Sequence, residues 1–336
     1  MKEKLKVPDK LPLLEGLCWN IADPYSLSCQ EMLGIYEERW HFVGVLGKPS
    51  STETEFIKQI TKTFGGLPLL EINDVDRQEF FNCVKAILRQ LNIELLERHK
   101  TCLGGGSLIG LKHGTLRRSS DLDFLVNPKN YNQIKRAINN GAKIIPAESD
   151  LVVGEPRIDR YGIRYPLTIV REKKEINLKL EIVAEYNLDI GTPDKCENVP
   201  CLNLIDRITA KLIANADRWC DRNKFSRDLI DLAIIANQQQ LPSEAIVYAN
   251  NIYPDAEKCL IEAIEQFQDL ADYRQKCYQT LQVSEPYAIV NGLDKLAQNY
   301  GLPPTKRSFG EIDFGYLDEV SPSSPDKLNN EEKLEP

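Results

Sequence analysis

The stretch GGGSLIGLKHGTLRRSSDLD, from Gly104 to Asp123, decides the fold of this chain. It follows a short apolar run at residues 101–103, and its last three residues open a second apolar run. Such runs beside glycines are typical of strands. Side chains alternate between the two faces of a strand, so we expect Asp121 and Asp123 to point the same way. The stretch therefore predicts a strand, a glycine loop, a short helix that begins at Ser107, and a strand with two carboxylates on one face.

Two carboxylates on one strand face repel each other unless a cation lies between them. Magnesium prefers a few carboxylates together with waters and phosphate oxygens. A glycine run lets backbone N–H groups approach phosphates closely, and a helix N-terminus favours negative charge. Either pattern alone is common in loops and turns, but here thirteen residues separate Ser107 from Asp121. At this spacing, the two patterns together indicate a metal site that faces a phosphate-binding loop.

These motifs resemble those of a known enzyme superfamily. Gly-Gly-Gly-Ser followed by Asp-Leu-Asp resembles the nucleotidyltransferase motif of the DNA polymerase beta superfamily. The segment from Arg118 to Phe124, RSSDLDF, is similar to that of the AbiEii/AbiGii toxin family, the toxins of type IV toxin–antitoxin and abortive-infection systems. The Walker pattern is excluded, because no Gly-Lys-Ser/Thr follows the glycines.

The resemblance implies an α+β fold, in which a nucleotidyltransferase-type mixed sheet with flanking helices is followed by a helical C-terminal domain. It implies an enzyme that transfers a nucleotide from a nucleoside triphosphate to an acceptor hydroxyl and releases pyrophosphate. Asp121 and Asp123 would bind Mg²⁺ or Mn²⁺. Nucleotide-binding residues would be Gly105, Gly106, Ser107, Ser119 and Lys211.

A third carboxylate is expected on a later strand. Residues 162–170 and 176–183 read as two strands joined by a charged turn. In the superfamily the second such strand carries a carboxylate, and Glu181 matches that place, where it would act as a base or help to hold a second metal. Glu185 has the same strand parity and is the competing candidate. An exposed strand glutamate with neither role is the alternative for both.

The helical region that follows resembles the family in two further places. Lys211 lies in a segment that looks like the family's lysine-bearing helix, and residues 227–231 (RDLID) resemble its Lys/Arg-Asp-x-x-Asp segment. The resemblance implies that Lys211 neutralises triphosphate charge and that Asp228 orients Lys211.

The chain divides into four parts. We expect an N-terminal extension over residues 1–75, mostly helical and of unknown function, and a nucleotidyltransferase core over 76–200. A helical domain over 201–310 would complete the active site, and 311–336 would form a disordered acidic tail.

Composition narrows the setting of the protein. The 336 residues are 42% hydrophobic and 27% charged, which is ordinary for a globular protein. No apolar run is long enough to cross a membrane, no signal peptide core follows the basic N-terminus, and nine irregularly spaced cysteines favour reduced thiols. We therefore expect a cytoplasmic protein with no membrane partner.

Charge distribution bears on the acceptor. The net charge is −8, but residues 311–336 hold eight acidic and two basic side chains. Basic residues gather at 157–179 and 207–227, either as phosphate-binding patches or as a solvated, salt-bridged surface. The resemblance implies RNA, such as the end of tRNA, as acceptor and a cognate antitoxin as partner. A protein hydroxyl as acceptor, and a non-catalytic nucleotide-binding or partner-binding module, are the alternatives.

Overall fold

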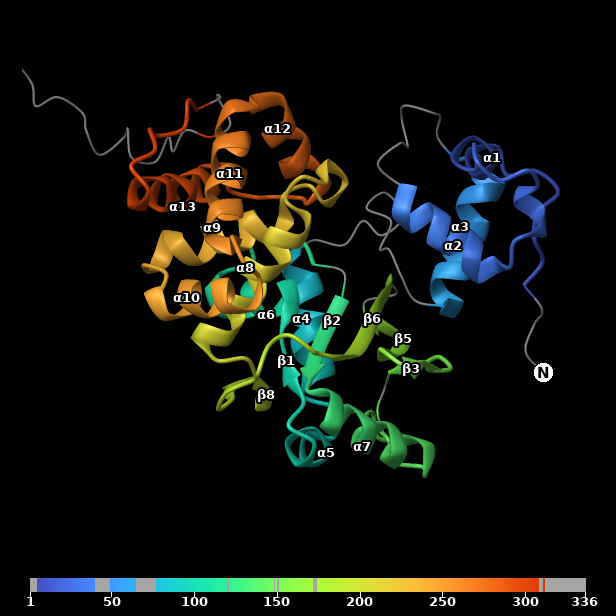
Figure 1. Ribbon diagram of the computed structural model, residues 1–336. Coiled ribbons are helices and arrows are strands. Elements are labelled where there is room, and N and C mark those ends of the chain that lie inside the picture. The colour runs from blue at the N-terminus through green and yellow to red at the C-terminus, as the bar shows by residue number, and fades with distance from the viewer. Residues whose placement is uncertain are drawn as a thin grey trace, which may run out of the picture.

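The computed structural model describes residues 5–39, 49–64, 77–119, 121–147, 149, 151–171, 174–307 and 311. Its centre is a mixed eight-stranded sheet with helices packed around it, followed by a group of C-terminal helices (Figure 1). The predicted fold class is therefore confirmed.

The sheet has the order β3-β5-β6-β2-β1-β8-β7, and β4 pairs with β5 at the same side as β3. Strand β2 is parallel to β6 and antiparallel to β1, while β1 is parallel to β8. The strands are β1 (Cys102–Leu103), β2 (Asp121–Val126), β3 (Val152–Val153), β4 (Arg157–Ile158), β5 (Gly162–Arg171), β6 (Lys174–Ala184), β7 (Asp194–Cys196) and β8 (Val199–Cys201).

The two central strands alternate as the sequence predicts. In β2, Leu122 and Phe124 are fully buried, whereas Asp121 and Asp123 lie on the other, partly exposed face. In β6, the apolar positions Leu178, Leu180 and Ile182 are buried and the residues between them are partly exposed. Strand alternation thus separates a core face from a polar face, and the polar face carries the candidate site.

The core of the sheet is covered by helices that precede and helices that follow the glycine loop in the sequence. It is built from α4 (Arg77–Leu88), α5 (Ile93–Arg98) and α7 (Pro128–Asn139), together with buried strand residues. Asn127 caps α7, because its side chain accepts a hydrogen bond from the Asn130 N–H, and a proline opens the helix. The predicted N-cap of α4, Asp76, lies outside the described residues.

The glycine loop leads directly into α6 (Gly105–His113), which therefore begins two residues earlier than Ser107. Gly105 has a φ of 65°, in the left-handed region that glycine tolerates best. The helix packs against β2 and against α9 (Arg227–Gln238), so it joins the sheet to the C-terminal helices.

The C-terminal helices share a core of their own, to which Ile109 of α6 contributes. They are α8 (Leu204–Arg218), α9, α10 (Ser243–Ile252), α11 (Ala256–Asp269), α12 (Ala271–Thr280) and α13 (Pro286–Asn299), with the short 3₁₀ helix η3 (Arg222–Lys224) between α8 and α9. Asn203 caps α8 by accepting a hydrogen bond from the Asp206 N–H.

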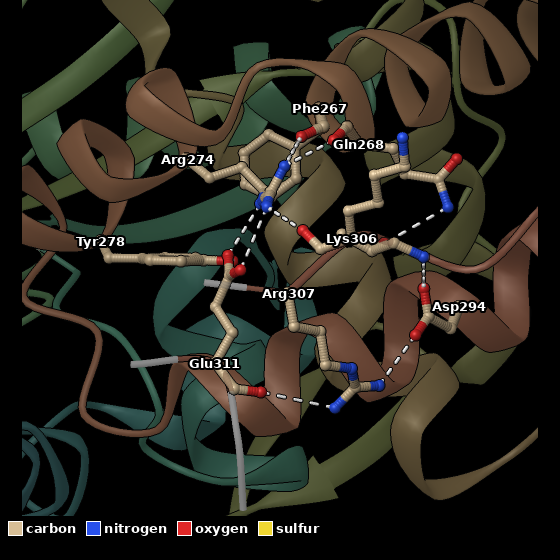
Figure 2. A network of polar contacts seen from close by, with 9 residues as sticks. Phe267, Gln268, Arg274, Tyr278, Asp294, Lys306, Arg307 and Glu311 are labelled. Atoms are coloured by element: carbon tan, nitrogen blue, oxygen red, sulfur yellow. Dashed lines mark hydrogen bonds and ion pairs between the residues drawn. The ribbon is translucent and has the colours of Figure 1, made fainter. Parts of the chain in front are cut away.

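A buried ion pair fastens the end of the described chain to this group. Arg274 of α12 donates to both carboxylate oxygens of Glu311, at 2.7 and 3.0 Å, and both side chains are fully buried (Figure 2). Tyr278 donates to the same carboxylate. Glu311, the first residue of the predicted tail, thus belongs to the packed helical region, while residues 312–336 lie outside the described ones.

The N-terminal helices form a third, separate cluster (Figure 1). It contains α1 (Pro12–Leu17), the 3₁₀ helix η1 (Pro24–Ser26), α2 (Cys29–Arg39) and α3 (Ser51–Phe64). The buried carboxylate of Glu53 accepts hydrogen bonds from the N–H groups of Leu13 and Leu14 and from the Tyr36 hydroxyl. Within the described part of the chain, no helix is long and apolar enough to span a bilayer.

Candidate active site

Four charged side chains form a compact patch on the polar face of β2 and β6. The parallel register sets Asp121 opposite Lys179 and Asp123 opposite Glu181. Lys179 Nζ lies 2.6 Å from Glu181 Oε1 and 3.7 Å from Asp121 Oδ1. Arg164 of β5 approaches Glu181 from the other side, with its Nε 3.6 Å from the same Oε1 atom. Three carboxylates and one lysine therefore share a small part of one sheet face.

The crowding of carboxylates affects the pKa of Asp123. Burial, and then the neighbouring carboxylates of Asp121 and Glu181, raise the pKa of Asp123 to about 6. Lys211 and Lys179 offset part of that rise. Burial is the main cause of this rise and the two carboxylates add to it, and a pKa perturbed in this way is common in functional sites.

The glycine loop lies directly against Asp123. A Cβ atom on Gly105 would fall 2.2 Å from Asp123 Oδ2, and the positive φ of Gly105 adds to the restriction. A Cβ atom on Gly106 would fall 2.4 Å from Arg117 Nη2 and 3.1 Å from the Ser119 hydroxyl oxygen. Glycine at position 105 therefore allows the loop to come this close to the Asp123 carboxylate.

Ser107 joins the loop to the strand. Its side chain is fully buried, and its hydroxyl donates a hydrogen bond to the main-chain carbonyl of Asp121. This bond fixes the start of α6 beside the first carboxylate. Ser119 is partly exposed and lies two residues before Asp121, next to Gly106.

The donor set fits a hard divalent cation. Asp121 and Asp123 present carboxylate oxygens from one strand face, and oxygens are the ligands that Mg²⁺ and Mn²⁺ prefer. Among the described residues, however, no cluster of three or more His, Cys, Asp or Glu side chains is arranged to hold a metal ion. Asp121 and Asp123 are therefore the two candidate protein ligands for such an ion.

A buried ion network lies on the helical side. Lys211 of α8 contacts two aspartates of α9, with its Nζ 3.0 Å from Asp228 Oδ1 and 2.6 Å from Asp231 Oδ2. Arg117 binds Asp231 with two parallel hydrogen bonds of 2.6 Å each, and Arg218 donates to Asp228 at 2.7 Å. The contact between Lys211 and Asp228 is thus present, although Asp228 shares Lys211 with Asp231.

Charge in this network is well compensated. Burial alone would raise the pKa of Asp228, but Lys211 and Arg218 hold it well below its usual range. For Asp231, Arg117 and Lys211 lower the pKa against the same effect of burial. Asp231 in turn raises the pKa of Arg117, against the opposing effect of burial. Asp228, Asp231 and Arg117 therefore stay ionised over the ordinary pH range.

Glu185 is placed differently from Glu181. Its carboxylate accepts hydrogen bonds from the N–H groups of Asn187 and Leu188, and so it closes the turn that follows β6. Of the two candidates for the third carboxylate, Glu181 is the one that lies beside Asp123.

Four charged residues were missed as members of the site: Lys179, Arg117, Asp231 and Arg218. Lys179 could have been found, because strand parity sets it on the same face as Glu181. Asp231 stands three residues after Asp228 in the motif, but its partner Arg117 is 114 positions away, and no local pattern reveals such a pair.

A cavity of about 710 Å³ lies elsewhere, lined by Glu79, Asn82, Cys83, Lys85, Ala86, Arg89 and Val170. None of the predicted site residues lines it. The candidate site is therefore defined by its charged side chains and not by this cavity.

A family model described as "Nucleotidyl transferase AbiEii toxin, Type IV TA system" matches residues 86–276, more than half of the chain. No curated protein matches. A candidate nucleotidyltransferase from H. pylori is 20% identical, covers 67% of this chain and 95% of its own, and has a TM-score of 0.41.

Two further solved structures are similar. JHP933 from Helicobacter pylori is 19% identical over 68% of this chain and 92% of its own, with a TM-score of 0.40. MenT4, a nucleotidyltransferase toxin from Mycobacterium tuberculosis, is 14% identical over 73% of this chain and 91% of its own, with a TM-score of 0.38.

Proposed function

Because the chain belongs to the AbiEii family of nucleotidyltransferase toxins of type IV toxin–antitoxin systems, we propose that it moves a nucleotide from a nucleoside triphosphate to an acceptor hydroxyl and releases pyrophosphate. One observation carries this proposal. The glycine loop lies so close to Asp123 that a Cβ atom on Gly105 would fall 2.2 Å from its carboxylate. A phosphate-binding loop and a pair of carboxylates therefore meet at one point.

Asp121 and Asp123 are proposed to hold Mg²⁺ or Mn²⁺, which when bound would polarise the transferred phosphoryl group and offset its charge. The raised pKa of Asp123 supports this role, since a cation would relieve the repulsion among the three carboxylates. The two carboxylates come from one strand, so their spacing is set by the sheet rather than by a loop.

The triphosphate is proposed to lie over the N-terminus of α6. The backbone N–H groups of Gly105, Gly106 and Ser107 are the first of that nine-residue helix and would donate to phosphate oxygens. Ser119 borders the same loop and would contact the nucleotide as well. Ser107 contributes through its N–H group, while its hydroxyl holds the loop against Asp121.

Lys211 and Asp228 are proposed to act from the helical side. A triphosphate carries about four negative charges, and one divalent ion offsets only part of them. Lys211 supplies a further positive charge, and its contacts with Asp228 and Asp231 fix its position. Lysine loses rotamer freedom when it binds, so holding it in advance raises the fraction of productive complexes.

Glu181 is proposed as the third charged group of the reaction. It lies opposite Asp123 in the register and would either take the proton of the acceptor hydroxyl or hold a further group of the site in place. The ion pair that Glu181 forms with Lys179 helps to decide between these two roles.

RNA is the proposed acceptor, in the manner of the end of a tRNA, and a cognate antitoxin is the proposed partner. The connection between α8 and α9 supports the first proposal, since Arg222 and Lys224 are exposed on η3, between the two helices that carry the ion network. Both would meet phosphates of an approaching strand. A reaction of this kind on nucleoside triphosphates would take place in the cytoplasm.

The test is direct labelling. The full chain is incubated with Mg²⁺, total cellular RNA and each α-labelled nucleoside triphosphate in turn, with Asp123→Asn as control. We expect label in RNA with one or two of the triphosphates and none with the variant. Label in protein instead of RNA would show that the acceptor is a protein hydroxyl. No transfer to either, with a nucleotide that binds, would favour a non-catalytic nucleotide-binding module.

A further inference from the structure

We propose that Lys179 is a built-in cation of the carboxylate patch, which holds Glu181 away from metal coordination so that the site takes one divalent ion rather than two. This inference rests on the proposed function, because it assigns the metal to Asp121 and Asp123. It makes Glu181 a positioning residue, one that acts through Lys179.

The geometry of the pair supports this assignment. Lys179 and Glu181 are two residues apart on β6 and share its polar face, and Lys179 Nζ is 2.6 Å from Glu181 Oε1. Both side chains are largely buried, with 19% and 16% of their surface exposed. An ion pair this short and this sheltered from water differs from the exposed pairs that contribute little.

Glu181 is also held from its other side. Arg164 Nε lies 3.6 Å from the same Oε1 atom, while Arg164 Nη1 donates to Asp159 at 2.6 Å. The carboxylate that the superfamily pattern would offer to a second metal is thus already engaged by two cations.

The charges agree with a single ion. The carboxylates of Asp121, Asp123 and Glu181 would carry three negative charges, of which Lys179 neutralises one, while Arg164 lies closer to the carboxylate of Asp159 than to Glu181. The remainder equals the charge of one divalent cation. A second divalent ion would have to approach Lys179, whose Nζ is 3.7 Å from Asp121 Oδ1, and like charges at such distances repel strongly in a partly buried site.

In sites with two metals, the ions clamp both sides of the transferred phosphoryl group. A lysine is a compact point charge and can supply part of the same neutralisation without being exchanged. Lys179 would therefore replace the charge of the second ion, and the lost ligand would be Glu181.

Manganese binding tests this directly. Mn²⁺ alone is titrated into the full chain, and free Mn²⁺ is followed by electron paramagnetic resonance, with isothermal titration calorimetry for the stoichiometry. We expect one Mn²⁺ per wild-type chain. Lys179→Met should bind Mn²⁺ about tenfold more tightly or better, because a repelling charge is removed and Glu181 becomes available as a ligand.

A double-mutant cycle separates a ligand from a positioning residue. Glu181→Gln should weaken Mn²⁺ binding less than about threefold in the wild-type background but about tenfold or more in the Lys179→Met background. Equal losses in the two backgrounds, or two ions bound to the wild-type chain, would overturn the proposal.

Three control variants accompany the Mn²⁺ binding measurements. Lys195→Met removes a lysine of β7 that pairs with Glu97 and should leave Mn²⁺ binding unchanged. Lys179→Arg keeps the charge and should stay close to the wild type even if Lys179→Met folds poorly. Asp123→Asn should remove binding. Mn²⁺ binding that survives Asp123→Asn would overturn the metal site itself, whereas two ions that both depend on Asp123 would overturn only the role of Lys179.

Discussion

Two clusters of charged side chains in this molecule are built from the same residue types but differ in charge balance. On β2 and β6, the three carboxylates of Asp121, Asp123 and Glu181 outnumber the two cations that contact them, Lys179 and Arg164. Between α8 and α9, by contrast, Asp228 and Asp231 are outnumbered by the cations that contact them, Lys211, Arg117 and Arg218.

The pKa shifts of the aspartates run in opposite directions for this reason. Burial and like charges raise the pKa of Asp123, whereas at Asp228 and Asp231 the partner cations outweigh burial and lower it. An aspartate with a surplus of negative neighbours is prepared for a cation from outside, and an aspartate with paired cations is part of the scaffold. The comparison therefore separates groups that we expect to react from groups that hold them.

The largest effect should follow from the unbalanced cluster. Asp121→Asn or Asp123→Asn replaces a charged metal ligand with a neutral isostere, so nucleotide transfer at saturating Mg²⁺ should fall by about 10⁴-fold or more, over 5 kcal/mol of transition-state stabilisation. The fold should remain intact. Single-turnover transfer and circular dichroism measure the two properties.

A matched control lies on α8. Asp217 is exposed, so Asp217→Asn should change turnover less than about twofold. Near-normal transfer by both Asp121→Asn and Asp123→Asn would remove the metal assignment.

The balanced cluster should respond in stability. Asp231→Ala leaves Arg117 and Lys211 buried beside each other without their shared carboxylate, which typically costs about 3–5 kcal/mol. Urea unfolding should show this loss in the free energy of unfolding, while Asp217→Ala on the exposed face of α8 stays within about 0.5 kcal/mol. If Asp231→Ala were as stable as the wild type, the network would not be a scaffold.

A smaller effect is expected for Lys211, the residue of the balanced cluster that we propose to act on the nucleotide. Lys211→Ala should raise the apparent KM for nucleotide and lower kcat, together by about 10- to 100-fold in kcat/KM. Asp228→Ala should be milder, because Asp231 still contacts Lys211 at 2.6 Å. If Asp228 acts through Lys211, the double variant should be no worse than Lys211→Ala.

Fully additive losses in that cycle would mean that the two residues act independently. Steady-state kinetics across a nucleotide series provides the numbers. An unchanged KM with a lowered kcat in Lys211→Ala would instead mean that the lysine interacts with the nucleotide only in the transition state.

The sequence could predict the unbalanced cluster but only half of the balanced one. Strand alternation sets Asp121 and Asp123 on one face, and parity narrows the third carboxylate to Glu181 or Glu185. Choosing between these two depends on where β6 ends, and it ends at Ala184, so Glu185 enters a turn. Strand ends depend on pairing with neighbours, which a single strand's pattern does not contain.

The balanced cluster depends on contacts between distant segments. Helix periodicity and family resemblance gave Lys211 and Asp228, but Arg117 reaches Asp231 across 114 positions. The short strands β3, β4, β7 and β8 were missed for a similar reason, since two or three residues carry no periodicity and are defined by their partners. Local patterns therefore predicted the long elements and the motif, and tertiary pairing supplied the rest.

The smallest expected effect tests whether Asp123 has a surplus of negative charge around it. A folded-state pKa of about 6 for Asp123, against an ordinary value of about 3.9, means that ionisation of this group opposes folding. The penalty is complete above about pH 7 and is mostly lost by about pH 4, as the carboxyl becomes protonated in both states. Because Asp123 is partly exposed, we expect about 1–2 kcal/mol rather than the full value of the shift.

Asp123→Asn should therefore be more stable than the wild type by about 1–2 kcal/mol at pH 8 in EDTA, as measured by urea unfolding, and the difference should vanish near pH 4. Adding Mg²⁺ at pH 8 should reverse the order, because only the wild type gains binding free energy in its folded state. A variant that is less stable than the wild type in EDTA at pH 8 would show that Asp123 is already balanced by the protein, as Asp228 and Asp231 are. The contrast between the two clusters would then have to rest on exposure alone.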